Sequence, residues 1–114
     1  MKEIKAIVQP FMLSKVIAGL HEMVEHLPGV TVSEVRGFGK NRGHDNDGPI
    51  ASAEAEYAPK TKLEIVVCDD VAASVVEVIL ARAHTGNPGD GKIFVYPLED
   101  VVKIRTGERG EGAI

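Results

Sequence analysis

Residues 63–96, LEIVVCDDVAASVVEVILARAHTGNPGDGKIFVY, predict a strand, a helix, a turn and another strand in succession. Leu63, Ile65 and Val67 alternate with their neighbours, which is the period of a strand with one buried face. Two aspartates follow, and they place negative charge at the start of a helix, where the helix dipole favours it. The stretch is therefore one strand–helix–strand unit.

The helix of this unit has one apolar stripe and runs from the two aspartates to about His84. The stripe consists of Val71, Val75, Val78 and Ile79. Residues 85–91, TGNPGDG, form a turn by composition. Residues 93–96, IFVY, then predict the second strand of the unit.

The N-terminal part of the chain repeats the pattern. Alternating apolar residues predict a strand that Pro10 stops, and these residues are Ile4, Ala6 and Val8. A helical spacing follows until Pro28-Gly29 ends it. Its apolar positions are Leu13, Val16, Ile17, Leu20, Met23, Val24 and Leu27. Residues 30–38, VTVSEVRGF, are rich in β-branched residues and predict the next strand.

The predicted order is β-α-β-β-α-β, followed by a short extra strand at residues 101–105, VVKIR. Two such units indicate a ferredoxin-like α+β fold, in which helices cover one face of a mainly antiparallel sheet. The other face would expose Val66, Phe94 and Tyr96 to water unless another surface covers it. An oligomer that packs these faces together would supply that cover.

Length and composition exclude several functional classes. A chain of 114 residues is by default one domain, and 44% apolar and 26% charged residues are ordinary for a globular protein. A net charge of −4 argues against a nucleic-acid binder that neutralises phosphates. No apolar run is long enough to span a bilayer, and the N-terminus lacks a signal-peptide core. The single cysteine, Cys68, cannot form an internal disulfide, which fits a reducing cytoplasm.

Residues 39–60, GKNRGHDNDGPIASAEAEYAPK, form a long connection with one strongly apolar aliphatic residue, Ile50. Connections inside compact domains are usually about 4–6 residues, so one of this length is either functional or disordered. Because it joins the second and third strands, which pair as a hairpin, it would project from the sheet as an arm.

The turn at residues 85–91 is the first candidate binding site. Gly86, Gly91 and Lys92 have the spacing of a Walker phosphate loop, but Ile93 replaces the Ser or Thr that binds Mg²⁺. The turn also precedes a strand, whereas a Walker loop opens a helix. Three glycines and a lysine can still form a backbone nest for anionic groups, and an ordinary glycine-rich turn is the alternative.

The sequence HDNDG, residues 44–48, partly matches a calcium-binding loop with Asp45, Asp47 and Glu54 as ligands. Gly43 would then occupy the first ligand position and no helix flanks the stretch, which favours a solvated acidic loop. No set of Ser, His and Asp, of Cys and His, or of paired carboxylates indicates catalysis.

Four stretches resemble the PII nitrogen-regulatory signal-transduction proteins: MKEIKAIVQPFML, TVSEVRGFGKNRGH, APKTKLEIVV and TGNPGDGKIFVYPLEDVVKIRTGERGEGAI. The resemblance covers residues 1–114 as one domain and needs no gap. It implies a ferredoxin-like homotrimer in which residues 39–59 form a protruding T-loop. In this family the T-loop changes shape with bound ATP, ADP and 2-oxoglutarate. It also contacts a target protein, such as a membrane transporter or a metabolic enzyme.

The resemblance further implies an ATP/ADP site in the cleft between neighbouring subunits. Within residues 85–92, the phosphate-binding turn would consist of Gly89, Asp90, Gly91 and Lys92. The other nucleotide-binding positions would be Ile7, Thr31, Gly37, Gly39, Lys40, Glu64 and Val66. Lys103 and Arg105, in the C-terminal segment 101–114, would reach the phosphates from the adjacent subunit. Cations from two chains and the N–H groups of a glycine-rich turn suit a triphosphate.

Several positions depart from the family pattern. Asn41 replaces the glutamine that binds Mg²⁺ with ATP and helps to hold 2-oxoglutarate, whereas Lys60, which pairs with the 2-oxoglutarate carboxylate, is present. Lys40 and Lys103 stand where arginine is usual, so the charge is kept and the bidentate fork is lost. Ala53 stands where many members carry a uridylylated tyrosine. These departures indicate a diverged paralogue whose T-loop serves a different partner.

Two other functions stay open beside that of a non-enzymatic regulator. Some PII-like proteins hydrolyse ATP slowly, and a metal-responsive trimer could use His44, Asp45 and Asp47. We expect a cytoplasmic protein that binds no nucleic acid and meets a membrane only through a transporter partner.

Overall fold

The structure is a computed structural model, and it describes residues 1–38 and 57–114. The first range contains β1 (Lys2–Val8), the 3-10 helix η1 (Pro10–Met12), α1 (Leu13–Met23) and β2 (Val30–Gly37). The second contains β3 (Ala58–Val67), α3 (Asp69–Ala83), β4 (Gly91–Pro97) and η2 (Glu111–Ala113). The predicted order β-α-β-β-α-β is confirmed.

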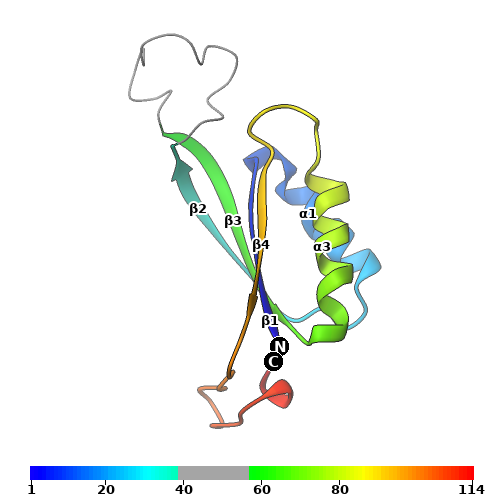
Figure 1. The fold of residues 1–114 in the computed structure, drawn as a ribbon, viewed down its shortest axis with the longest axis vertical. Helices are drawn as coiled ribbons and strands as arrows, with labels where there is room; N and C mark the ends of the chain where they lie inside the picture. The colour runs from blue at the N-terminus through cyan, green and yellow to red at the C-terminus, as the bar shows by residue number, and fades with distance from the viewer. Residues whose placement is uncertain (39–56) are drawn as a thin grey trace.

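The four strands form one antiparallel sheet in the order β2-β3-β1-β4. The helices α1 and α3 pack against each other on the same face of this sheet (Figure 1). A four-stranded antiparallel sheet with two helices on one face is the ferredoxin-like α+β fold that the sequence predicts.

The core lies between the sheet and the two helices. The register places Ile4 opposite Ile65 and Ala6 opposite Leu63, so alternate residues of β1 and β3 share the covered face. These four side chains are fully buried. The helices add the fully buried side chains Val16, Leu20, Val75 and Ile79. Each large aliphatic side chain buried in this way stabilises the fold by about 1.5–3 kcal/mol relative to an exposed one.

Helix α1 ends earlier than its apolar spacing predicts. The helix stops at Met23, and Val24 has extended backbone angles (φ −111°, ψ 108°) although its N–H still donates to the Leu20 carbonyl at 3.0 Å. His26 then has a φ of 54°, and the turn brings Leu27 against the core. The apolar spacing continues beyond the helix because turn residues pack against the same core.

The short strand predicted at residues 101–105 does not form, and Val102 makes only an isolated bridge with Arg109. The N–H of Gly107 donates to the carbonyl of Lys103 at 2.7 Å, so the chain turns back directly after Lys103. An ion pair of 2.6 Å between Arg109 and Asp100 joins the two sides of this turn. The segment after β4 lies at the opposite end of the molecule from the turn between α3 and β4 (Figure 1).

The second face of the sheet carries no helix in the described ranges. Phe94 and Tyr96 lie on this uncovered face and each is 39% exposed. The ammonium group of Lys5 lies 5.6 Å from the Phe94 ring centre and 4.9 Å from that of Tyr96, within the range of cation–π attraction. Val66 is half-buried on the same face. A single chain therefore leaves an aromatic surface open, as the sequence predicts.

No helix in the two described ranges is both long enough and apolar enough to cross a membrane.

Candidate functional site

The turn between α3 and β4 is held together by the carboxylate of Asp90. The backbone N–H groups of Thr85 and Gly86 donate to Asp90 Oδ2 at 2.8 and 2.9 Å. The Thr85 hydroxyl donates to Asp90 Oδ1 and accepts a hydrogen bond of 3.1 Å from the Asn87 N–H. The Thr85 side chain and these backbone donors lower the pKa of Asp90. These hydrogen bonds within the turn define its shape.

The family resemblance implies that Asp90 binds nucleotide, but its carboxylate is occupied by its own turn. Three hydrogen bonds from Thr85 and Gly86 reach the two oxygens, and His84 Nδ1 lies 3.9 Å from Oδ2. A carboxylate directed at a phosphate would repel it. In this geometry the carboxylate of Asp90 shapes the turn, and the binding of nucleotide by Asp90 stays a prediction.

Two glycines of the turn have conformations that other residues rarely adopt. The φ angles of Gly89 and Gly91 are 95° and 99°. A Cβ on Gly91 would lie 1.7 Å from the carbonyl oxygen of Ile7, because β4 begins in close contact with β1. A Cβ on Gly89 would lie 2.9 Å from Gln9 Nε2 and 3.3 Å from Lys60 Nζ. The backbone at Gly89 is thus directly accessible to these two polar side chains.

Lys60, near the start of β3, connects that strand to the turn. Its ammonium group donates to the carbonyl oxygen of Gly89 at 2.6 Å and to Gln9 Oε1 at 3.1 Å. Partial burial lowers the pKa of Lys60, and the negative charge of Asp90 opposes that effect. The predicted 2-oxoglutarate residue Lys60 and the predicted phosphate residue Gly89 therefore meet in one place.

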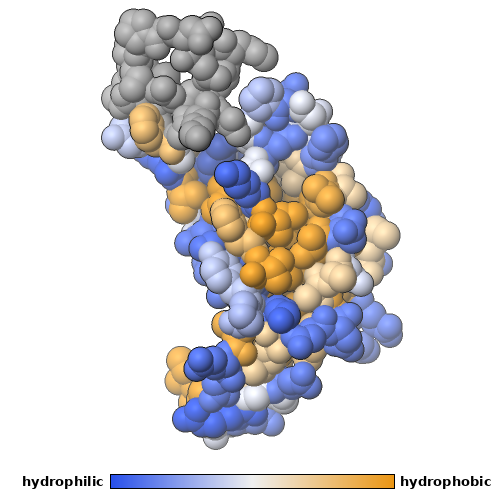
Figure 2. All heavy atoms as spheres, in the orientation of Figure 1, coloured by the Kyte–Doolittle hydropathy of each residue, from blue (hydrophilic) through white to orange (hydrophobic). Residues whose placement is uncertain are grey.

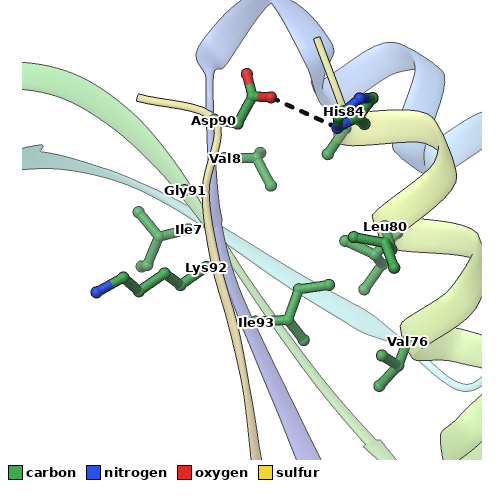
Figure 3. A pocket seen from close by; sticks show the side chains of 11 residues that line it. Ile7, Val8, Val76, Leu80, His84, Asp90, Gly91, Lys92 and Ile93 are labelled. Atoms are coloured by element: carbon green, nitrogen blue, oxygen red, sulfur yellow. Dashed lines mark ion pairs between the residues drawn. The ribbon is translucent and has the colours of Figure 1, made fainter. Parts of the chain in front are cut away.

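Most of the other candidate residues lie on the uncovered face of the sheet. The register places Ile7 opposite Lys92 and Thr31 opposite Glu64. Gly37, Lys60 and Val66 share that face by the alternation of their strands. In Figure 3, Ile7 and Lys92 project to the side of the sheet away from α3.

A groove of about 400 Å³ opens on the covered side, between α3 and β4. Its walls are mainly apolar, with Val76 and Leu80 from the helix and Ile93 from the strand, and His84 and Asp90 stand at one end (Figure 3). Figure 2 shows the same region as an apolar patch on the surface. Ile7 and Lys92 also line this groove, but their side chains project to the side of the sheet away from α3 (Figure 3). The predicted phosphate site at Lys92 therefore lies on the opposite side of β4 from the apolar part of the groove.

Lys103 and Arg105 are not brought to the turn in a single chain. Both belong to the segment after β4, at the far end of the molecule (Figure 1). Lys103 instead lies 3.7 Å from Glu108 within that segment, and Arg105 is exposed. Within one chain, these two cations cannot contribute to the site at Lys60 and Gly89.

The remaining predicted positions, Gly39, Lys40 and Asn41, lie outside the described residues, and so do the candidate metal ligands His44, Asp45 and Asp47. Within the described ranges, no group of three or more His, Cys, Asp or Glu side chains could hold a metal ion. The described part of the site has the lysines Lys60 and Lys92, whose positive charge suits an anion. The binding of Mg²⁺ by Asn41 stays a prediction.

Sequence reasoning missed two residues, Gln9 and Thr85. Thr85 lies five positions before Asp90, and a Thr and an Asp at the two ends of a glycine-rich turn are a local signal that could have indicated their hydrogen bonds. Gln9 and Lys60 are 51 positions apart, and only the pairing of β1 with β3 brings them together. No local pattern indicates that contact.

The comparisons with known proteins all find similarity to the same family. The family described as Nitrogen regulatory protein P-II matches residues 1–108. The nitrogen regulatory proteins P-II of Azospirillum brasilense and Rhodospirillum rubrum are each 46% identical to this chain over 114 residues, which is 100% of both chains in each pair. The crystal structure of Arabidopsis thaliana PII bound to citrate matches with a TM-score of 0.78 and 42% identity, covering 99% of this chain and 91% of that chain.

Proposed function

The chain belongs to the P-II family of nitrogen regulatory proteins, which are signal-transduction regulators, and we propose that it binds ATP and ADP and controls a target protein through its T-loop. The observation that carries the proposal is the turn at residues 85–91, which its own hydrogen bonds shape and whose Gly89 backbone lies against the Lys60 ammonium group. We expect the protein to act in the cytoplasm, as a regulator and not as an enzyme.

The proposed nucleotide lies on the uncovered side of the turn. Its phosphates would contact Lys92, which projects from that face, and the backbone around Gly89, where a side chain would obstruct them. Lysine and backbone N–H groups are suitable donors to phosphate oxygens. The aliphatic side chain of Ile7, opposite Lys92 in the register, would contact the less polar part of the ligand.

A second, carboxylate ligand is proposed for Lys60. Its ammonium group has only neutral acceptors in the described part of the chain, Gln9 and the Gly89 carbonyl, so its charge is available to an anion. The solved Arabidopsis relative is bound to citrate, a polycarboxylate. For this chain the proposed carboxylate is 2-oxoglutarate with Mg²⁺ and ATP, and Asn41 in place of glutamine should weaken its binding.

We also propose that the protein is a homotrimer. Phe94 and Tyr96 are partly exposed on the uncovered face, Leu80 is 54% exposed in the groove, and Ile104 is fully exposed after β4. Exposed apolar surfaces of this kind usually mark contacts with another chain. An assembly that brings the segment after β4 to the turn of a neighbour would add Lys103 and Arg105 to the site. Sedimentation should give a mass three times the 12.2 kDa of the chain, and a monomer would contradict the proposal.

Titration calorimetry with ATP and with ADP tests the nucleotide site. Both should bind, and Lys92→Ala should weaken both by about tenfold or more, since a hydrogen bond to a charged group is worth about 1.5–3 kcal/mol. Arg105→Ala should weaken ATP more than ADP if its guanidinium group contacts the terminal phosphate. Lys15→Ala, which removes an exposed lysine of α1, is the matched control. A wild-type protein that binds neither nucleotide would refute the site, and phosphate release in single-turnover experiments would favour the slow ATPase instead.

A further inference from the structure

The ammonium group of Lys60 is held by two neutral oxygens. The Gly89 carbonyl accepts one hydrogen bond at 2.6 Å and Gln9 Oε1 accepts another at 3.1 Å. An ammonium group has three donors, so one N–H is left for a further acceptor. Across the two described ranges, no ion pair joins Lys60 to a carboxylate. The oxygens of Asp90, whose charge acts on Lys60, accept hydrogen bonds within their own turn.

Gln9 is placed to control the position of this ammonium group. It follows β1 directly and has extended backbone angles (φ −65°, ψ 136°), and its side chain is partly buried. Its oxygen accepts from Lys60, while its Nε2 lies 2.9 Å from the point that a Cβ on Gly89 would occupy. The amide of Gln9 is therefore hydrogen-bonded to a side chain of β3 and lies close to the turn. Gln9 and the Gly89 carbonyl together hold the Lys60 ammonium group.

The chemical type of this residue matters as much as its position. A glutamine amide supplies a hydrogen bond and no charge, so it orients Lys60 and leaves the positive charge uncompensated. A glutamate would have nearly the same shape, but its carboxylate would form an ion pair with Lys60 and compete with any anionic ligand.

We propose that Gln9 is a positioning residue that directs the charge of Lys60 toward the turn at Gly89 without neutralising it, and so makes the site selective for an oxyanion. This inference deepens the proposed function and rests on it, because it assumes that a ligand oxyanion binds at the turn. The oxyanion is either a phosphate of the nucleotide or the carboxylate of a small acid. Gln9 acts on either ligand through Lys60 and need not contact it.

The test compares two substitutions that separate shape from charge. Gln9→Glu keeps the shape and adds a charge, whereas Gln9→Met keeps the length and removes the hydrogen bond. A residue that only filled space would tolerate glutamate at least as well as methionine. The proposal requires the reverse order, with Gln9→Glu weakening ligand binding by about tenfold and Gln9→Met weakening it by a few-fold. Ser74→Glu is the matched control, since it adds the same charge at an exposed position of α3.

Calorimetry with ADP, with MgATP, and with 2-oxoglutarate in the presence of MgATP distinguishes the two sources of the oxyanion. A loss confined to 2-oxoglutarate identifies the carboxylate as the ligand of Lys60, and a loss already seen with the nucleotides identifies a phosphate. Equal binding of all ligands by wild type and Gln9→Glu would overturn the proposal.

A second measurement separates this inference from the proposed function. The pKa of Lys60 can be followed in the full-length protein by NMR of isotope-labelled lysine, with its signal assigned from Lys60→Arg. The carboxylate of Gln9→Glu should raise the pKa of Lys60, whereas Gln9→Met should not. If wild type binds no nucleotide but this order of pKa values is found, the proposed function fails and the positioning role of Gln9 stands. If the pKa of Lys60 is the same in Gln9→Glu and wild type, the positioning role fails.

Discussion

Gly91→Ala should be among the most destabilising single substitutions in this chain. Gly91 has a φ of 99°, and a non-glycine residue in such a left-handed conformation costs roughly 1–2 kcal/mol. The new Cβ would lie 1.7 Å from the carbonyl oxygen and 2.7 Å from the carbonyl carbon of Ile7. These are backbone atoms of β1, an inner strand of the sheet, so they cannot move away without disturbing the pairing of β1 with β4.

The magnitude follows from these two contributions. Forcing additional atoms into a packed region typically costs about 1–3 kcal/mol, so the sum is about 2–5 kcal/mol. Small domains are stable by only about 5–15 kcal/mol, so this loss is a large part of the total. Two other glycines provide graded controls. Gly107 has a φ of 76°, and a Cβ added to it would meet no atom within 4 Å, whereas Gly29 has open space and no positive φ.

Urea unfolding at one fixed protein concentration measures the series. The free energy of unfolding should fall most for Gly91→Ala. It should fall by about 1–2 kcal/mol for Gly107→Ala and hardly at all for Gly29→Ala. Equal destabilisation by Gly91→Ala and Gly107→Ala would show that the close approach of β4 to β1 has no energetic consequence. A loss of nucleotide affinity by Gly91→Ala with unchanged stability would instead assign Gly91 to the ligand and not to the sheet.

Two further predictions concern Asp90 and Asn41. Hydrogen bonds from Thr85 and Gly86 hold the pKa of Asp90 below its ordinary value of 3.8. The charged form of Asp90 therefore stabilises the fold above pH 3.8, and this stabilisation is lost as the pH falls through the lowered pKa. The urea midpoints of wild type and Asp90→Asn should therefore differ at pH 7 and converge below pH 3.8, and a gap that is constant with pH would contradict this role. Asn41→Gln should strengthen 2-oxoglutarate binding in the presence of MgATP, because its amide oxygen reaches one methylene further, and calorimetry showing no gain would count against the assignment of Asn41.

The architecture could be predicted from the sequence because the main signals are local. The alternation at Ile4, Ala6 and Val8 and at Leu63, Ile65 and Val67 is the same alternation that the register shows on the covered face. Both strands have one buried side, so a slip by one residue would expose their whole apolar set. The order of the elements then leaves few ways to pair them.

The predictions that failed concern places where a local pattern is compatible with two structures. Leu27 continues the spacing of α1, but it packs from a turn, and hydrophobic periodicity does not distinguish these cases. Val102 and Ile104 alternate like strand residues, but the hydrogen bond from Gly107 to Lys103 turns the chain before a strand can form. The contact of Gln9 with Lys60 is a different case, because no prediction was made for it. It joins the ends of two strands that are far apart in the sequence, and no local pattern indicates it.

The described residues that flank the proposed T-loop are held by the sheet, and this limits how a ligand could act on the loop. Gly37 pairs with Ala58 at the last step of the β2–β3 ladder, and the rings of Phe38 and Tyr57 lie 5.9 Å apart just beyond it. Phe38 and Tyr57, the described residues on either side of 39–56, therefore lie next to each other at the end of the β2–β3 hairpin. Lys60 lies on the same strand, two positions after Ala58, and its hydrogen bond to Gly89 connects this end of the hairpin to the turn. A ligand oxyanion that accepts from the remaining N–H of Lys60 would add a contact near the base of the proposed loop while the sheet stays unchanged. A signal from the ligand to the T-loop would then pass through side chains at the root, and a rearrangement of the strands is not required.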